Sequence, residues 1–122
     1  MKHTLAPETL ALGQGLYYAV TGIWPLLSMR TFEVVTGPKT DKWLVKTVGV
    51  LVAVIGAALA LAGWRRNVAP ESAILAAGSA AGLGAIDTVY ATKGRISKIY
   101  LLDAIVEAAL VVAWAAARRR AA

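Results

Sequence analysis

The sequence contains no cysteine, one histidine and one phenylalanine among its 122 residues. Without cysteine the chain cannot form a disulfide, a thiolate metal site or a cysteine nucleophile. The single histidine, His3, stands close to the N-terminus, so neither a histidine-based metal site nor a Ser-His triad is expected. We therefore expect no metal ion and no organic cofactor, and several common classes of enzyme are excluded.

Acidic residues are also few. The chain has 7 Asp and Glu against 13 Lys and Arg, which gives a formal net charge of +6. In a soluble protein such an excess would suggest nucleic-acid binding. Here the basic residues stand at the ends of apolar segments, as they do where membrane helices meet lipid head groups. The expected partner is therefore the lipid bilayer, with no binding of nucleic acid.

Charge is absent from two long stretches, residues 9–29 and 47–64. Each has about the length that a transmembrane helix needs, roughly 20 residues. Hydrophobic residues make up 58% of the chain and the mean hydropathy is +0.62, which is above the range of ordinary soluble proteins. The pattern predicts an all-α, polytopic membrane protein: a single domain, residues 1–122, with four transmembrane helices in an antiparallel bundle, at about 8–29, 43–64, 71–91 and 97–117.

Small residues recur every three or four positions in two of these segments: Gly49, Ala53, Gly56, Ala60 and Gly63 in the second, and Gly78 and Gly82 in the third. Such seams let helix backbones approach closely in lipid, where packing replaces the hydrophobic driving force. We expect them to pack within the chain. A homodimer through the glycines of either seam is the alternative.

The longest connection, residues 30–42, carries mixed charges and the turn sequence Thr36-Gly37-Pro38. We expect a solvated loop here, with a cap over the bundle as the alternative. The connection between the third and fourth segments, residues 92–97, is short and basic, so these two segments should form a helical hairpin.

Two acids lie inside the last apolar segment. Asp103 and Glu107 are four residues apart and therefore share one helical face. Because a carboxylate facing lipid is costly, this face must turn toward protein or water. At 1.5 Å per residue, Asp87 and Asp103 lie roughly 6–8 Å below the end that carries the loops 30–42 and 92–97, and Glu107 lies about 6 Å deeper. Lys46 lies about 5 Å inside the same end, so polar side chains gather in one half of the bundle.

Aromatic residues and an amide extend this polar group. Tyr18 and Gln14 belong to a polar stripe on the first segment, and Trp24 stands near its end. The stripe predicts either a contact face between helices or the lining of a cavity. The candidate residues for binding a ligand or proton are therefore Asp87, Asp103, Glu107, Lys46, Tyr90, Tyr100, Tyr18, Trp24 and Gln14. A buried pair of Lys46 with an acid that only fixes helix register is the structural alternative.

Three acids at this depth cannot all be ionised comfortably, because burial and like charge both oppose it. The sequence thus favours a one-sided polar vestibule that binds or transports a proton, a cation or a small cationic or amphipathic ligand. Two alternatives stay open. One is a structural or assembly protein that packs through its small-residue seams. The other is a membrane enzyme with isomerase-like acid/base chemistry by Asp103 and Glu107 on a lipid-soluble substrate.

The basic residues give little information about orientation. Six stand at the end of the termini (Lys2, Arg65, Arg66, Arg118, Arg119 and Arg120), and seven stand at the vestibule end (Arg30, Lys39, Lys42, Lys46, Lys93, Arg95 and Lys98). The arginine cluster near the C-terminus favours cytoplasmic termini in a cell inner membrane.

Two strings of the sequence resemble a group of small bacterial four-helix integral membrane proteins. They are YYAVTGIWPLLSMRTFEVVTGPKTDKWLVKTVG, at 17–49, and AIDTVYATKGRISKIYLLDAIVE, at 85–107. The resemblance implies a fold of four membrane helices and assigns no activity.

Overall fold

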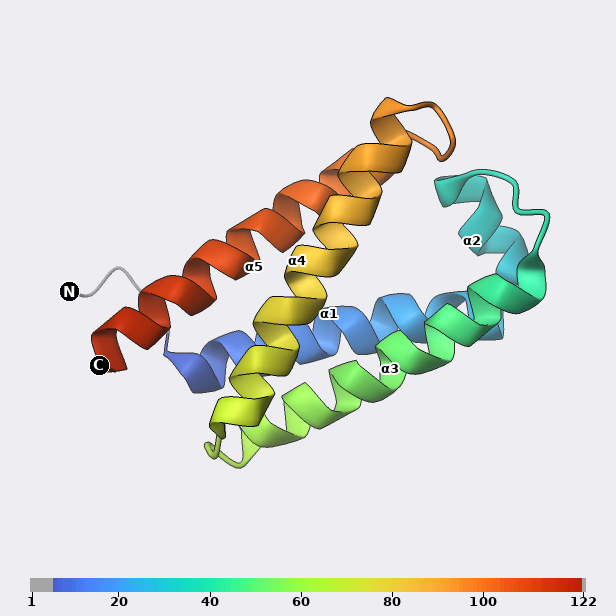
Figure 1. Ribbon diagram of the computed structural model, residues 1–122. Helices are drawn as coiled ribbons and strands as arrows, with labels where there is room; N and C mark the ends of the chain where they lie inside the picture. Colours follow the sequence, from blue (N-terminus) through green and yellow to red (C-terminus); the bar gives the residue numbers. More distant parts are fainter. Residues whose placement is uncertain (1–5, 122) are drawn as a thin grey trace.

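The computed structural model describes residues 6–121, which form five helices and no strand. They are α1 (Pro7–Leu27), α2 (Met29–Thr36), α3 (Lys42–Trp64), α4 (Pro70–Thr92) and α5 (Tyr100–Ala121), shown in Figure 1. Three helices are long and apolar enough to cross a membrane: α3, α4 and the part of α5 up to Arg118. The all-helical class and the membrane character that the sequence predicts are thus confirmed.

The helix ends follow local sequence signals. Both α1 and α4 begin with a proline followed by a glutamate, Pro7-Glu8 and Pro70-Glu71. Proline fits the first turn of a helix, and the acid stabilises the positive end of the helix dipole. The last helix begins at Tyr100 and not at Ser97 as expected, because the Ser97 side chain accepts a hydrogen bond from the Ile99 N–H (3.2 Å) and so belongs to the turn.

The segment expected to be a solvated loop contains the helix α2 instead. Ser28 ends α1 by donating its N–H to the Trp24 carbonyl (2.9 Å), and its side chain accepts the Thr31 N–H (3.3 Å) at the start of α2. Gly37, with a φ of 99°, ends α2 in a conformation that favours glycine. Phe32 packs edge-to-face against Trp24, with the ring centroids 5.3 Å apart. The helix α2 therefore folds back over the end of α1.

The small-residue seam of α3 packs against α1. A Cβ atom placed on Gly56 would lie 2.6 Å from the Gly15 carbonyl oxygen, and one on Gly49 would lie 2.6 Å from the Gly22 carbonyl oxygen. These distances show backbones in direct contact, as the spacing predicts. The α3 glycines, Gly63 included, are thus covered by α1, and a homodimer through them stays a prediction.

The other pair of glycines is uncovered. In the described part of the chain, no atom of a neighbouring element lies within 4 Å of the position that a Cβ would take on Gly78 or Gly82. A homodimer through these two residues stays a prediction.

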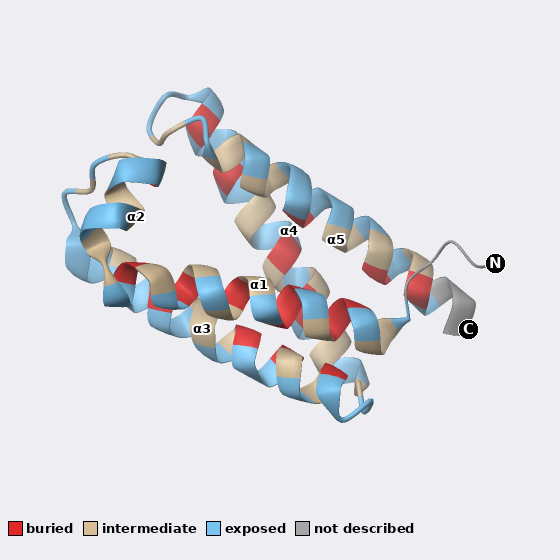
Figure 2. Cartoon of the chain, turned by 180° about the vertical axis from the view of Figure 1, so that it is seen from behind, coloured by how far each residue is buried: buried red, intermediate tan, exposed pale blue. Residues whose placement is uncertain are grey.

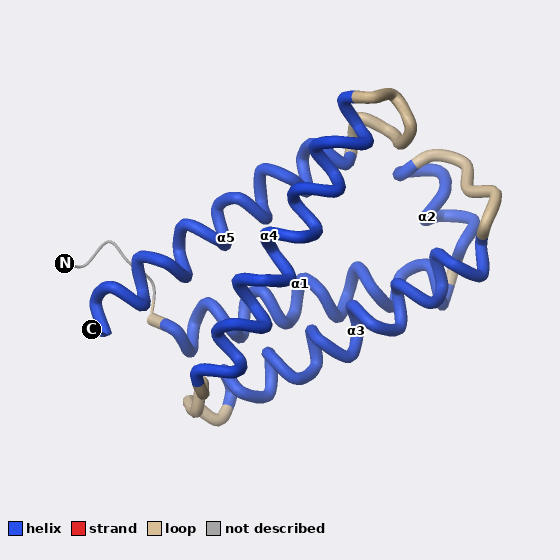
Figure 3. Tube along the Cα trace, in the orientation of Figure 1, coloured by secondary structure: helices blue, strands red, loops and turns tan. Residues whose placement is uncertain are grey.

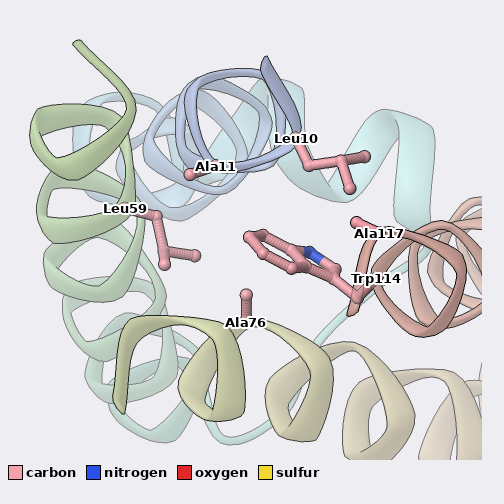
Figure 4. Packing of buried hydrophobic residues seen from close by; sticks show 6 residues of the cluster. All are labelled: Leu10, Ala11, Leu59, Ala76, Trp114 and Ala117. Carbon is pink, nitrogen blue, oxygen red and sulfur yellow. The ribbon is translucent and has the colours of Figure 1, made fainter. Parts of the chain in front are cut away.

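The helices associate as two hairpins, α1 with α3 and α4 with α5, and contacts between the hairpins are sparse. The start of α1 and the end of α5 lie at one end of the molecule, whereas α2 and the turn 93–99 lie at the other (Figures 1 and 3). The hairpins meet at the first of these ends in a hydrophobic cluster of Leu10, Ala11, Leu59, Ala76, Trp114 and Ala117. In Figure 4 the Trp114 indole extends into the middle of this cluster. The molecule is therefore closed and apolar at this end.

Large apolar side chains cover much of the outer surface, and buried positions recur along the length of α1 (Figure 2). Trp43 and Trp64, at the two ends of α3, are 68% and 76% exposed. At 1.5 Å per residue they lie about 32 Å apart along the helix, close to the ~30 Å thickness of the hydrocarbon core. Their exposure at this separation is typical of tryptophans at the two faces of a bilayer.

Candidate functional site

A cavity of about 1160 Å³ lies between the two hairpins, toward the end that carries α2 and the turn 93–99. All five helices contribute to its lining. Six of the residues selected from the sequence line it: Tyr18, Trp24, Asp87, Tyr100, Asp103 and Glu107. The structure thus brings the three acids of α4 and α5 to one space.

Glu107 is the most deeply buried of these acids, with 1% of its surface exposed. It accepts a hydrogen bond of 2.6 Å from the Tyr18 hydroxyl, which is itself buried. Gly84 of α4 packs closely against it, because a Cβ there would lie 3.1 Å from the Glu107 Cβ. Glu107 is therefore held between α1 and α4, and its hydrogen-bond donor is a neutral phenol.

Asp103 stands one helical turn nearer to the turn 93–99 and is half-buried. It accepts a hydrogen bond from the Tyr17 hydroxyl. The rings of Tyr17 and Tyr18 lie 6.1 Å apart, so two adjacent residues of α1 supply donors to two acids of α5. Tyr17 was not selected from the sequence, although its spacing from Gln14 and Thr21 matches the same helical stripe.

Asp87 of α4 completes the group and is only 6% exposed. Its Oδ2 atom is buried and has no hydrogen-bond partner among the residues that the structure describes. An unpaired buried carboxyl oxygen is rare in folded proteins because its lost hydration is not replaced. Asp87 lines the cavity, so a molecule that enters the cavity can reach this residue.

We call Asp87, Asp103 and Glu107 the carboxyl triad. Within residues 6–118 the one ion pair joins Glu33 to Lys42 (3.5 Å), outside the triad. No group of three or more His, Cys, Asp or Glu in the described part of the chain has an arrangement that could hold a metal ion. Chemically, the triad offers acceptor oxygens, Tyr17 and Tyr18 donate to two of its members, and within residues 6–118 no basic side chain is ion-paired with it.

Gln14 does not line the cavity, in contrast to its selection as a ligand-binding residue. It is 2% exposed and lies one turn below Tyr18, near the closed end. Its Nε2 donates to the Ala76 carbonyl (2.9 Å), and its Oε1 accepts from the Trp114 Nε1 (2.7 Å). Gln14 therefore joins α1 to both helices of the other hairpin, and both its hydrogen-bonding groups are used.

Lys46 and Tyr90 also lie outside the cavity lining. Lys46 is exposed on α3 and has no acid within ion-pair distance among the described residues, so the structural alternative, a buried pair of Lys46 with an acid, is not formed there. Tyr90 is 39% exposed, and the Lys93 ammonium lies 5.9 Å from its ring centroid. Counting depth along a helix does not fix which way a residue faces, and both side chains lie on the exposed surface.

The part of the cavity lined by Trp24, Phe32, Lys39 and Tyr100 is rich in aromatic rings, and we call it the mouth. The Lys39 ammonium lies 4.9 Å from the ring centroid of Tyr100 and 5.8 Å from that of Phe32, and it donates to the Thr36 carbonyl (3.1 Å). Lys39 and Phe32 line the cavity together with Tyr100 and Trp24. Phe32 and Lys39 were not selected from the sequence, since residues 30–42 were expected to be solvated.

Glu33 fixes the turn that follows α2. Its Oε2 accepts the Lys39 backbone N–H at 2.7 Å, and its Oε1 lies 3.5 Å from the Lys42 ammonium. The Lys39 N–H, and then the charge of Lys42, hold the pKa of the Glu33 carboxyl below its usual range. Both carboxyl oxygens of Glu33 are thus used, one by the Lys39 backbone N–H and one by the Lys42 ammonium.

Comparisons of the chain with protein-family models, with curated proteins and with solved structures found no match.

Proposed function

We propose that this protein is a four-span membrane protein that binds a small amphipathic cation, in exchange for a proton, at its carboxyl triad. The observation that carries the proposal is the buried, unpartnered Oδ2 of Asp87 at the cavity, beside two further acids and no ion-paired base. A proton or a cation at this position would supply the missing partner. Intramembrane acids in such a setting mark ion and substrate sites.

The fourth span in this proposal is α1. Its 21 residues carry no charge beyond Glu8, and its outward side presents Leu16, Val20 and Leu27, which are 53%, 67% and 83% exposed. The opposite side carries the residues that lower its average hydropathy, and these are buried against protein: Gln14, Gly15, Tyr18 and Gly22. A helix of this kind can cross a bilayer because only its apolar side meets lipid.

The cavity has the size and chemistry for a small organic cation. Its volume of about 1160 Å³ exceeds that of many small-molecule sites, which run to ~1,000 Å³. Aromatic rings line the mouth and carboxyls line the interior, so an apolar body and a positive charge can both be accommodated. The hydroxyls of Tyr17 and Tyr18 donate hydrogen bonds to Asp103 and Glu107. A cation that binds either carboxyl therefore displaces a neutral phenol and not a positively charged side chain.

The test uses the protein in lipid nanodiscs and benzyltrimethylammonium as the probe. Calorimetric titration in buffers of different ionisation enthalpy gives both the affinity and the number of protons released. We expect Asp87→Asn and Glu107→Gln to weaken binding about tenfold or more, which corresponds to ~1.4 kcal/mol, and to reduce proton release. Glu71→Gln is the matched control, because Glu71 is exposed at the far end of α4.

Two outcomes would refute the proposal. One is no binding of the probe to the unmodified protein. The other is an equal affinity and equal proton release in the protein and in both triad variants.

We further propose that the protein lies in a bacterial inner membrane with its termini in the cytoplasm. The absence of cysteine allows single-cysteine labelling without background. Thr40→Cys reports the vestibule end and Asn67→Cys reports the other end, since both residues are exposed in connections. A membrane-impermeant maleimide added to intact spheroplasts should label the first and not the second. The reverse pattern would invert the orientation, and equal labelling would show insertion in both orientations.

A further inference from the structure

An ammonium group already occupies the mouth of the cavity. The Lys39 Nζ lies over the rings of Tyr100 and Phe32, at 4.9 and 5.8 Å from their centroids, which is the range of cation–π contacts. The two rings come from different elements, α5 and α2, and Trp24 of α1 supports the Phe32 ring edge-to-face. The mouth is thus built so that aromatic faces meet a positive charge.

The contacts that hold this ammonium are weak and exchangeable. Its hydrogen bond goes to a neutral acceptor, the Thr36 carbonyl, at 3.1 Å. The nearby acid, Glu33, is used by the Lys39 backbone N–H and by the Lys42 ammonium instead. Among the described residues no carboxylate therefore anchors the Lys39 side chain, which is half-buried. A competing cation has to displace only ring faces and one carbonyl.

A competing cation can bind at the aromatic rings only after the Lys39 ammonium has moved away from them. The cavity lining includes two basic residues, Lys39 and Arg95, and Lys39 stands at the aromatic rings themselves. While its ammonium remains there, it blocks the rings and repels an approaching cation. Its flexible side chain can swing out to water at little cost, since exposed lysine side chains are fully hydrated.

We propose that Phe32 and Tyr100 form a second subsite, for the ammonium group of an organic cation, and that Lys39 fills this subsite as a tethered competitor. The inference rests on the proposed function in one respect: the same cation would be handed on to the carboxyl triad. The subsite specifies the class of ligand: primary or quaternary ammonium compounds with an apolar body. It also identifies Lys39 as the residue that limits access to the cavity. Lys39 acts here as a plug that lowers apparent affinity by occupying the rings.

The experiment measures benzyltrimethylammonium binding to the full chain in nanodiscs by calorimetric titration. Lys39→Gln should tighten binding about threefold to tenfold, the range expected when a weak cation–π competitor is removed. Lys39→Arg keeps the charge and should leave the affinity within about twofold of the original. Arg95→Gln removes a positive charge from the cavity lining without touching the rings, so it should change the affinity less than Lys39→Gln does.

The aromatic rings are tested on the Lys39→Gln background. Adding Tyr100→Leu should abolish the gain in affinity, whereas adding Tyr100→Phe should keep it, because the ring face is retained. An unchanged or weaker affinity in Lys39→Gln would overturn the inference. So would an equal gain from Arg95→Gln, or a gain that survives Tyr100→Leu.

The triad variants separate this inference from the proposed function. If Asp87→Asn abolishes binding and Lys39→Gln has no effect, the mouth subsite is refuted and the proposed function stands. If Asp87→Asn and Glu107→Gln bind normally and Lys39→Gln still tightens binding, the mouth subsite stands and the triad is refuted as the binding site.

Discussion

The contact between α1 and α3 gives the sharpest structural prediction, through the single substitution Gly56→Ala. The added Cβ would lie 2.6 Å from the Gly15 carbonyl oxygen and 2.9 Å from the Tyr18 carbonyl carbon. Ordinary van der Waals contact of a Cβ begins at 3.4 Å, and the Ala19 backbone nitrogen lies even closer than the Gly15 oxygen, so the two backbones must separate by more than about 0.8 Å. Because both obstacles are backbone atoms, no side chain can rotate away, and we expect a loss of roughly 1–3 kcal/mol of unfolding free energy.

The same displacement reaches the site. The backbone of Tyr18 is among the atoms that the new methyl group would strike, and the Tyr18 hydroxyl is the donor to Glu107. Moving α1 away from α3 therefore changes the position of this hydroxyl relative to its carboxyl. We expect Gly56→Ala to weaken benzyltrimethylammonium binding as well as stability, although Gly56 does not line the cavity.

The assay is equilibrium unfolding in mixed micelles with increasing dodecyl sulfate, followed by circular dichroism. Gly82→Ala is the matched control, because no neighbouring element lies within 4 Å of its would-be Cβ. Alanine is the better helix former, so this variant should be unchanged or more stable by up to about 1 kcal/mol. If Gly56→Ala were as stable as the original chain and Gly82→Ala strongly destabilised, the close α1–α3 contact would be refuted, since the second result would indicate a seam between chains.

Three further predictions concern single hydrogen bonds. Gln14→Leu leaves the Trp114 indole N–H buried without its acceptor and should cost about 1–3 kcal/mol in the same unfolding assay, whereas adding Trp114→Phe should recover part of this loss; a purely additive double variant would contradict the pairing. Tyr18→Phe should lower unfolding free energy by about 1 kcal/mol and change the number of protons released on probe binding, and an unchanged proton count would show that this hydroxyl does not influence the triad. Because the pKa of Glu33 is held low, its bond to the Lys39 N–H should persist from neutral pH to below the usual carboxyl range and be lost as pH falls through the lowered pKa; hydrogen exchange should show protection of the Lys39 amide that disappears in Glu33→Ala at neutral pH.

Much of the fold was accessible from the sequence because membrane helices must be long, apolar and largely uncharged. The two middle helices begin and end within one residue of the predicted positions, 43–64 and 71–91. The short helix α2 was missed, since it is too short for a strong periodic signal. It depends on Ser28 acting as a cap and on Phe32 finding Trp24, and the latter contact is set by how the chain folds back.

The sequence indicates how far along a helix a polar residue lies, but it says less about which side of the helix that residue faces. Counting residues from the loop end placed Asp87, Asp103 and Lys46 at similar levels, and the structure brings the two acids to one cavity. Lys46 is exposed, although it stands three residues before Gly49 and therefore continues the spacing of the α3 seam. The spacing of the seam alone would have placed Lys46 toward α1, so its exposure could not have been inferred from the sequence.

The two tyrosines show where prediction from one helix ends. Tyr17 and Tyr18 are adjacent, and each keeps a spacing of three or four residues from Gln14 and Thr21, so the helical period alone cannot choose between them. The choice is made by the opposite hairpin. Its acids on α5 are four residues apart and stand at two depths, about 6 Å from each other along the axis. A single hydroxyl cannot donate to both acids. Tyr17 therefore donates to Asp103, and Tyr18 donates to Glu107. The site therefore depends on how the two hairpins pack together, and the residue spacing within one helix cannot predict it.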